Sequence, residues 1–237
     1  MANSSDRWKE YWTRRPASVG ELEFLKQVDR TINGREVDNE QIDLIVEMIG
    51  DKLGIGRNDH VIDLCCGNGF LTRRVAARAH SVLGIDFSAY LISVAEKHNR
   101  PNNVAYLCQS VLDLSGDVLE SLSRYGKAYS YDAMQYFSVT ESRTFLTLLA
   151  SISSRGFTLL LCGLPDHQRL FNFYDTPDRR RDYERRLANG TEAIGTWWSA
   201  SELAALGHET GFDCEILPQD QRLHTAHYRF NARLTRR

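Results

Sequence analysis

The fold is decided by the segment Val61-Ile62-Asp63-Leu64-Cys65-Cys66-Gly67-Asn68-Gly69-Phe70-Leu71-Thr72. Its first part, Val61 to Leu64, is mostly apolar and β-branched, which is typical of a strand buried on both faces of a parallel sheet. Gly67 and Gly69 follow in a short loop, where glycine permits positive φ and lets a ligand approach the backbone closely. The segment therefore predicts a strand, a tight loop that holds a small molecule, and the start of a helix.

A second apolar run, Ser81-Val82-Leu83-Gly84-Ile85-Asp86, also ends in an acid. In nucleotide-binding α/β sheets, an acid at this place accepts hydrogen bonds from a ribose diol. A dinucleotide-binding loop requires a third glycine, and Thr72 stands at that position, which weakens an NAD interpretation. We expect Asp63 and Asp86 to present their carboxylates at one edge of the sheet.

The stretch VIDLCCGNG resembles the first motif of the class I S-adenosylmethionine-dependent methyltransferases, and LGIDFS at Leu83 to Ser88 resembles the second. The resemblance implies that S-adenosyl-L-methionine is the cofactor and that Asp86 binds its ribose hydroxyls. Cys65 replaces the usual first glycine, and we expect an ordinary negative φ there. Ser110 and Val111 stand where many members have an acid that reads the adenine amino group, so adenine selection rests here more on Val111 and backbone groups.

The rest of the chain predicts strands alternating with helices. We expect a third strand at 103–109, a fourth strand with its active-site end at 129–136 and a fifth at 157–162, with helices at 38–49, 70–79, 88–98 and 140–153. The last two strands, 212–217 and 228–234, are joined by too short a segment for a helical crossover, so they should pair antiparallel. This ending resembles the methyltransferase fold: an α/β Rossmann-like three-layer sandwich with a seven-stranded, mostly parallel sheet and an antiparallel last strand.

Length and charge limit the function classes. The 237 residues are enough for one domain, and 29 Lys and Arg against 31 Asp and Glu give a formal net charge of -2, which does not attract nucleic acid or an anionic membrane. The N-terminus lacks the apolar core of a signal peptide, and no apolar run is long enough to span a bilayer. We expect a cytoplasmic protein with a small-molecule acceptor. The oligomeric state is left open.

The cysteines and acids give no metal motif. Cys65, Cys66, Cys108, Cys162 and Cys214 contain no C-x-x-C pair and mostly lie among apolar neighbours, so we expect reduced core residues and no bound metal.

Two segments outside the sheet are candidates for covering the site. Trp8, Tyr11 and Trp12 recur at helical spacing, which indicates either a helix packed on the flank of the domain or a lid over the pocket. We divide the chain into a lid segment, 1–37, and a methyltransferase domain, 38–237, with an acceptor-pocket insertion at 164–199. The arginines of the insertion are balanced by acids, which favours a solvated helix with internal ion pairs over an anion site.

The expected chemistry is methyl transfer to an oxygen or nitrogen of a small polar metabolite, such as a sugar, a polysaccharide precursor or a natural product. Gln135 and Tyr136 should face the sulfonium, because an aromatic face attracts a poorly solvated cation; Tyr136 fits a core position equally well. Histidine suits deprotonation of a hydroxyl near neutral pH, and we rank the candidate bases His227, His167 and His224. The predicted cofactor-binding residues are Asp63, Cys65, Gly67, Gly69, Asp86, Phe87, Ser110, Val111, Gln135 and Trp12. Two alternatives stay open: an NAD-dependent oxidoreductase and a non-catalytic subunit that keeps the methyltransferase fold.

Overall fold

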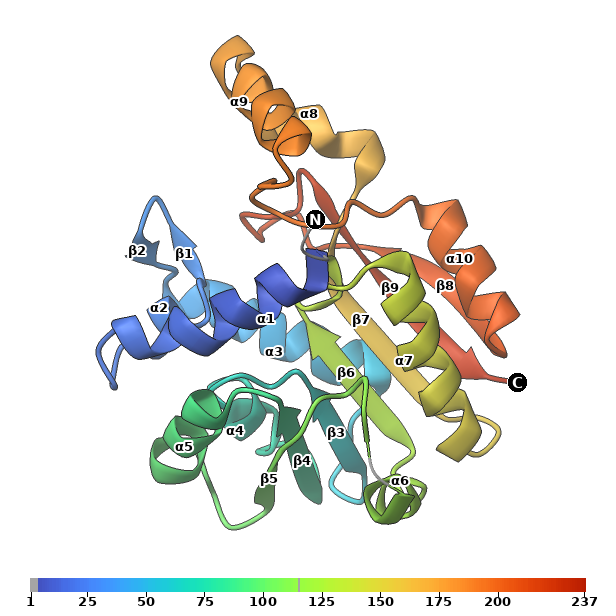
Figure 1. The fold of residues 1–237 in the computed structure, drawn as a ribbon. Coiled ribbons are helices and arrows are strands. Elements are labelled where there is room, and N and C mark those ends of the chain that lie inside the picture. The colour runs from blue at the N-terminus through green and yellow to red at the C-terminus, as the bar shows by residue number, and fades with distance from the viewer. Residues whose placement is uncertain (1–3, 115) are drawn as a thin grey trace.

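The structure is a computed structural model that describes residues 4–114 and 116–237. Its centre is a sheet whose strands follow the order β5-β4-β3-β6-β7-β9-β8 (Figure 1). Their bounds are Val104–Cys108, Ser81–Asp86, His60–Leu64, Lys127–Tyr131, Thr158–Pro165, Arg229–Arg236 and Phe212–Pro218, in that order. The strand β9 pairs antiparallel with both β7 and β8, and the other pairs are parallel. The predicted seven-stranded sheet with a reversed last strand is confirmed.

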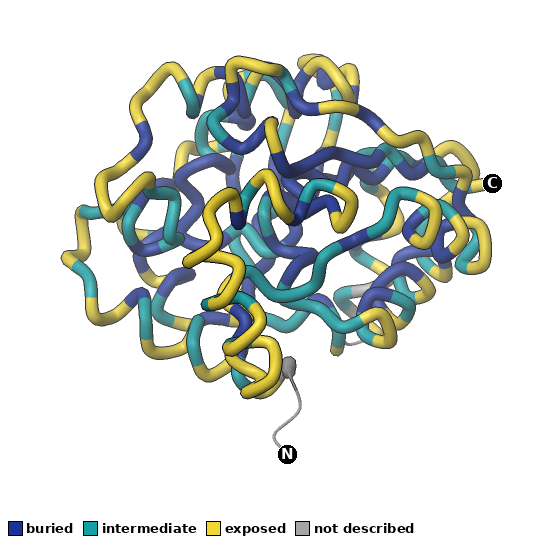
Figure 2. Tube along the Cα trace, turned by 90° about the horizontal axis from the view of Figure 1, so that it is seen from above, coloured by how far each residue is buried: buried dark blue, intermediate teal, exposed yellow. Residues whose placement is uncertain are grey.

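Two buried clusters flank the sheet because successive side chains of a strand point to opposite faces. Along β3, Val61 lies in the cluster packed under α3 (Asn39–Leu53) and α4 (Thr72–Val75). Its neighbour Ile62 lies in the other cluster, with α6 (Gly116–Leu122), α7 (Val139–Ile152) and α10 (Ala200–Glu209). The helix α5 (Ala89–His98) packs on β4 and β5. Figure 2 shows this buried interior surrounded by exposed connections.

The ends of α3 and α5 carry residues that commonly cap helices. Asp38 caps α3 by accepting from the Gln41 N–H, Ser88 caps α5, and Gly54 ends α3 in the left-handed region with φ of 57°. The Gln41 side chain does not return a bond to Asp38 as in a capping box: its amide donates to the Arg222 carbonyl and its oxygen accepts from the His224 N–H. It thereby ties the start of α3 to the turn between β8 and β9.

The predicted helix at 70–79 is too long, because α4 covers only Thr72–Val75. Beyond it, the backbone N–H groups of Ala77, Arg78 and Ala79 each bond to the carbonyl of the third residue before them. This is the tighter 3₁₀ pattern, which eclipses side chains and seldom extends far.

Two segments stand apart from the sandwich. The first runs from α1 (Ser4–Arg14) through η1 (Pro16–Ser18) and α2 (Phe24–Gln27) to a hairpin of β1 (Thr31–Ile32) and β2 (Arg35–Glu36). The second is an arm of η3 (His167–Arg169), α8 (Leu170–Phe173) and α9 (Pro177–Ala188), which projects from the body in Figure 1.

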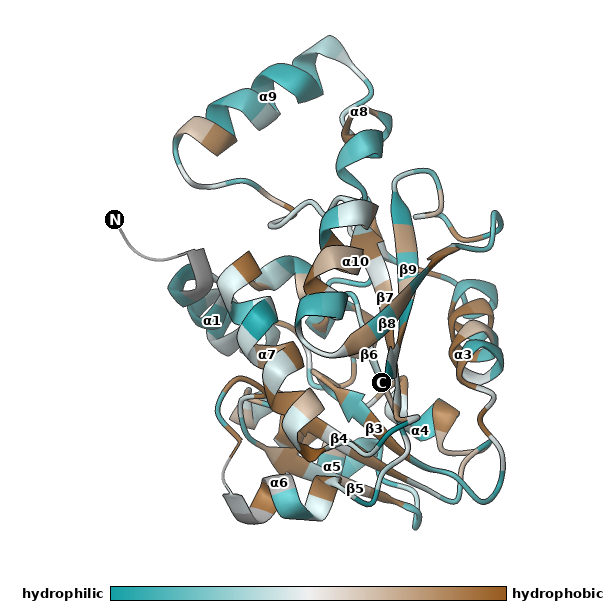
Figure 3. Ribbon diagram, turned by 90° about the vertical axis from the view of Figure 1, so that its right-hand side faces the viewer, coloured by the Kyte–Doolittle hydropathy of each residue, from teal (hydrophilic) through white to brown (hydrophobic). Residues whose placement is uncertain are grey.

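Most of α9 is hydrophilic (Figure 3), and its arginines form short-range ion pairs with acids of the same arm. The interpretation of this segment as a solvated helix with internal ion pairs is confirmed. Within the described ranges, every helix is too short or too polar to cross a membrane.

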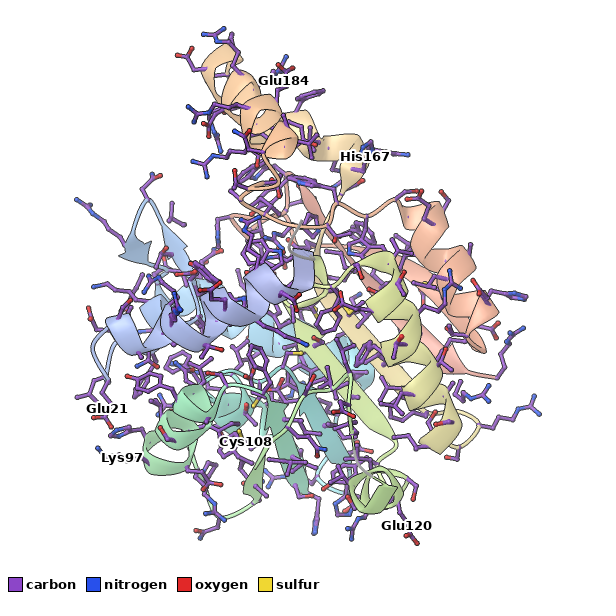
Figure 4. The ribbon with its side chains drawn as sticks, in the orientation of Figure 1. Glu21, Lys97, Cys108, Glu120, His167 and Glu184 are labelled. Carbon is purple, nitrogen blue, oxygen red and sulfur yellow. The ribbon has the colours of Figure 1, made fainter. Side chains whose placement is uncertain are left out.

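The cysteines are all free. Cys162 is buried and Cys65, Cys66 and Cys214 are partly buried, but Cys108, labelled in Figure 4, is exposed, so its assignment to the core is wrong. Cys108 is the last residue of β5, which lies at the edge of the sheet. The described residues contain no group of three or more His, Cys, Asp or Glu side chains arranged to hold a metal ion.

Candidate functional site

A cavity lies beyond the carboxyl ends of β3, β4 and β6, where open parallel sheets bind their ligands. The loop between β3 and α4, residues 65–71, is called the first loop. This loop, the end of β4 and the 3₁₀ turn η2 (Met134–Tyr136) form the walls of the cavity, and α1 contributes Trp8 and Trp12. All the predicted cofactor-binding residues except Gly69 line this cavity: Trp12, Asp63, Cys65, Gly67, Asp86, Phe87, Ser110, Val111 and Gln135.

The first loop turns through three left-handed residues. Gly67 and Gly69 have φ of 58° and 73°, and Cys65 has φ of 63°. The expected negative φ at Cys65 is therefore wrong: the residue adopts a conformation that favours glycine while carrying a side chain. The shape is required because the next residue, Cys66, donates its N–H to the Ile85 carbonyl of β4 at 3.0 Å. A left-handed non-glycine residue costs roughly 1–2 kcal/mol.

Gly69 is not among the residues that line the cavity, and its lack of a side chain makes room for a neighbouring residue. A Cβ on this residue would lie 2.2 Å from the Tyr106 hydroxyl oxygen. Tyr106 reaches across from β5, and its hydroxyl donates to the Asn99 carbonyl at 2.6 Å. The missing side chain of Gly69 therefore admits a tyrosine ring, and its predicted contact with the cofactor stays a prediction.

Asp86 is buried at the end of β4, and its carboxylate braces the first loop. One oxygen accepts from the Gly67 N–H and the other from the Ser88 N–H, both at 2.9 Å. Burial raises the pKa of Asp86, and these N–H groups oppose that rise by stabilising the ionised form. A carboxylate accepts about four hydrogen bonds, so roughly two acceptor positions remain for a ligand.

Asp63 is held by two side-chain hydroxyls, whereas the Gly67 N–H of the loop donates to Asp86. Asp63 accepts from the Thr72 hydroxyl at 2.6 Å and from the Tyr129 hydroxyl at 2.7 Å. Complete burial raises the pKa of Asp63 to about 6, although both hydroxyls lower it. The group can therefore adopt either protonation state near neutral pH, depending on the charge placed beside it.

The part of the cavity next to β5 is largely apolar. Val111 is buried and Phe87 has 36% of its surface exposed. The Ser110 hydroxyl accepts from the Leu112 N–H at 3.3 Å, so it belongs to a local turn. Phe87 and Val111 therefore give this part of the cavity an apolar lining.

Aromatic rings close the opposite end. The Tyr136 ring lies 4.7 Å from Trp8 and 5.2 Å from Trp12, measured between centroids. Only 6% of Trp8 is exposed, and both Trp8 and Trp12 line the cavity, so α1 packs against this end of the site.

Two contacts anchor α1 at its ends. Arg7 donates to the carbonyls of Gly190 and Glu192 at 3.1 and 2.8 Å, in the loop that follows α9. Ser88 donates to the Trp12 carbonyl at 3.3 Å. Farther along, Glu21 pairs with Lys97 of α5 at 2.6 Å, and both are labelled in Figure 4.

Sequence reasoning missed most of the charged residues that line the cavity, among them Arg30, Asp132 and Arg229. Arg30 follows an irregular segment, and its guanidinium carbon lies 4.8 Å from the centroid of the Tyr131 ring. The Nε atom of Arg30 is buried and has no hydrogen-bond partner among the described residues. No sequence signal places it there. Arg229 begins β9, where Arg233 and Arg236 also occur, so no sequence signal distinguishes it from the other arginines of the strand.

The three candidate histidines lie near this edge but are not among the residues that line the cavity. His224 contacts Gln41 at 3.0 Å, and burial lowers its pKa. The exposed His227 packs against the Tyr228 ring at 4.8 Å. His167 points outward from the base of the arm (Figure 4). Their role as a base stays a prediction.

Comparisons with known proteins agree with this geometry. A family model described as a methyltransferase domain matches residues 61–156. A ubiquinone biosynthesis O-methyltransferase of Coxiella burnetii is 36% identical over 63 residues, which are 26% of this chain and 27% of that protein. The match thus spans about a quarter of the length of this curated relative.

Solved structures share the whole fold at low identity. The magnesium protoporphyrin IX methyltransferase of Synechocystis PCC 6803 with bound S-adenosylmethionine has a TM-score of 0.61 and 16% identity, over 100% of this chain and 99% of that one. The N-methyltransferase NodS of Bradyrhizobium japonicum WM9 in complex with S-adenosylhomocysteine has a TM-score of 0.59 and 13% identity, over 99% and 98%.

The matched residues 61–156 contain the first loop, Asp86 and η2, which all contribute to the cavity lining. The antiparallel β9 separates the sheet from the wholly parallel dinucleotide-binding type. This chain carries a class I S-adenosylmethionine-dependent methyltransferase domain.

Proposed function

We propose that the protein transfers a methyl group from S-adenosylmethionine to an oxygen or nitrogen of a small polar metabolite. The observation that carries the proposal is Asp86, a buried carboxylate that faces the cavity with unused acceptor positions beside two left-handed glycines. The identity of the metabolite, whether a sugar, a polysaccharide precursor or a natural product, belongs to the same proposal.

The residues present fit the cofactor. Asp86 would hold the ribose hydroxyls, and Phe87 and Val111 would contact the adenine. At the other end, Asp63 suits an ammonium, because a nearby cation favours the ionised form of a buried acid. The Arg30 guanidinium is free of ion pairs among the described residues and suits a carboxylate. The cavity thus offers a partner to each charged group of a nucleoside that bears an amino acid.

The bound sulfonium supplies an activated methyl group. The protein's own residues have to orient the nucleophile, exclude water and accept a proton. Trp8, Trp12 and Tyr136 cover the cavity with aromatic area that suits the exclusion of water. We assign residues 1–37 to a lid on this basis.

The insertion, residues 164–199, supports the acceptor side indirectly. It contributes no side chain to the described cavity lining. Its return segment instead fixes η2, because the Thr196 N–H donates to the Gln135 carbonyl at 2.7 Å and the Thr196 hydroxyl donates to the Phe137 carbonyl at 2.7 Å.

Calorimetry followed by a turnover screen tests the function. S-adenosylmethionine and S-adenosylhomocysteine should bind the purified protein at a single site, and NADH should not. Incubation with fractionated cell metabolites and S-adenosylmethionine should then release S-adenosylhomocysteine in some fractions. Binding without release in any fraction would favour the non-catalytic subunit, and NADH binding in place of S-adenosylmethionine would favour the oxidoreductase.

A further inference from the structure

We propose that Asp132 is the catalytic residue that hydrogen-bonds the acceptor nucleophile and takes its proton, so that the methylated group is a hydroxyl or an amine and not a carboxylate. This inference rests on the proposed methyl transfer and names the acceptor class. Asp132 follows the last residue of β6 and lines the cavity together with Gln135 and Arg229.

The backbone of Asp132 is strained. Its φ is 56°, in the left-handed region, while its N–H still continues the sheet by donating to the Cys162 carbonyl at 3.0 Å. Such conformations cost free energy in residues other than glycine, and they concentrate where a side chain must point in a fixed direction. Here the result is a carboxylate that lines the cavity.

The neighbouring strand makes room for this carboxylate. Gly163 of β7 also has a positive φ, 73°, and a Cβ there would lie 1.9 Å from Asp132 Oδ1. The pairing of β7 with β9 shifts register between Leu161 and Leu164, around this glycine. Bulges of this kind occur next to active sites, where they redirect side chains.

Arg229 holds the Asp132 carboxylate in place by a hydrogen bond. It is 5% exposed, and its Nη1 donates to Asp132 Oδ1 at 3.2 Å, to Gln135 Oε1 at 2.5 Å and to the Gly163 carbonyl. The Gly163 N–H donates to Asn231 Oδ1 at 2.9 Å, so both polar groups of the bulge are satisfied by β9 side chains. Arg229 is a positioning residue.

One carboxylate oxygen is left for a ligand. Oδ1 of Asp132 is engaged by Arg229, while Oδ2 has no hydrogen-bond partner among the described residues. The side chain retains 29% exposure, in contrast to 6% for Arg229. A buried cation that orients a carboxylate with one free oxygen is an arrangement that accepts a hydrogen bond from a ligand donor.

The chemistry then selects the acceptor. A hydroxyl or amine donates its proton toward Asp132 Oδ2 while its lone pair forms a bond to the methyl carbon. The carbon–sulfur bond breaks, its electron pair stays on sulfur, and the proton passes to Asp132 and then to solvent. A carboxylate nucleophile has no proton to give, and its charge would approach that of Asp132.

Asp132→Asn tests the base, because asparagine tolerates the left-handed region and keeps an acceptor for Arg229. The expected result is unchanged S-adenosylhomocysteine affinity by calorimetry, within about threefold, and turnover of the active metabolite fraction that falls at least about 100-fold. Asp220→Asn, whose carboxylate pairs with Arg222 outside the cavity lining, is the matched control and should retain turnover.

Asp132→Gly supplies a readout that does not depend on turnover. Glycine accepts the left-handed conformation, and the vacated space lies beside the buried Arg229 cation. Sodium formate should therefore raise the thermal unfolding temperature of Asp132→Gly more than sodium chloride at equal ionic strength does. It should produce no such difference in the wild type, and it should restore part of the lost turnover.

Two results would overturn the inference while leaving methyl transfer intact. One is Asp132→Asn with wild-type turnover and normal cofactor affinity. The other is an active fraction whose methylated product is an ester of a carboxylate. A wild type that does not bind S-adenosylmethionine would instead refute the proposed function, and Asp132→Gly without a formate-specific stabilisation would refute the placement of the carboxylate against Arg229.

Discussion

Asp86→Asn separates the predicted ribose contact from the structural role of the same carboxylate. The substitution keeps the shape of the side chain and one carbonyl oxygen, but it removes the charge. In the free protein, one of the two loop bonds, to the Gly67 or the Ser88 N–H, is lost. Because burial of the charge itself is unfavourable, as the raised pKa of Asp86 shows, the neutral amide recovers part of that loss, and we expect the variant to fold.

The effect on cofactor binding should be larger. A hydrogen bond to a charged group contributes about 1.5–3 kcal/mol and a neutral one about 0.5–1.5 kcal/mol, so each ribose bond should weaken by about 1–1.5 kcal/mol. Two ribose bonds give about 2–3 kcal/mol, which is a rise in Kd of roughly 30- to 150-fold.

Calorimetry with S-adenosylhomocysteine measures this rise, and circular dichroism verifies the fold. Asp43→Asn is the control, because Asp43 is also paired with an arginine, Arg74, but has 63% of its side chain exposed and does not line the cavity. Its Kd should match the wild type. A folded Asp86→Asn variant with a Kd within about twofold of the wild type would remove Asp86 from the site.

Three further predictions concern stability and access. Burial raises the pKa of Asp63 from 3.8 to about 6, so the folded protein binds the Asp63 proton more tightly than the unfolded chain does. The contribution of Asp63 to the free energy of unfolding should therefore fall by up to about 3 kcal/mol as the pH rises from about 4 to about 7. Urea titrations at about pH 4 and 7 should show a smaller fall for Asp63→Asn, and equal falls would contradict the assignment. Gly69→Ala should lower the free energy of unfolding by about 1–3 kcal/mol more than Gly34→Ala, because both have positive φ but only Gly69 faces an obstacle, the Tyr106 ring; equal losses would show that the ring moves aside. Deletion of residues 1–20 should raise the Michaelis constants by exposing the cavity, and a stable truncation with unchanged kinetics would rule out the lid.

The cofactor half of the site was largely predictable because it depends on local sequence. A strand, a glycine loop and an acid at the end of the next strand are each encoded by neighbouring residues, and parallel pairing brings β3 and β4 to one edge. The antiparallel direction of β9 was predictable because the segment between β8 and β9 is too short for a helical crossover. Cys65 was misjudged because its left-handed φ is imposed by the bond between Cys66 and Ile85, which belongs to the sheet and not to the loop sequence.

The part of the cavity around Asp132 was decided by tertiary structure alone. Asp132, Gly163 and Arg229 are far apart in the sequence, and each is unremarkable in its own segment. They meet because β9 inserts beside β7 and because the register shift at Gly163 opens a space that Asp132 fills. Histidine was chosen from the sequence by its ordinary titration range, but the position of a side chain relative to a cavity depends on strand order, register and backbone strain. The sequence alone thus determined the class of domain and the loop after β3, while the packing of β6, β7 and β9 determined which charged groups line the cavity beside Asp132.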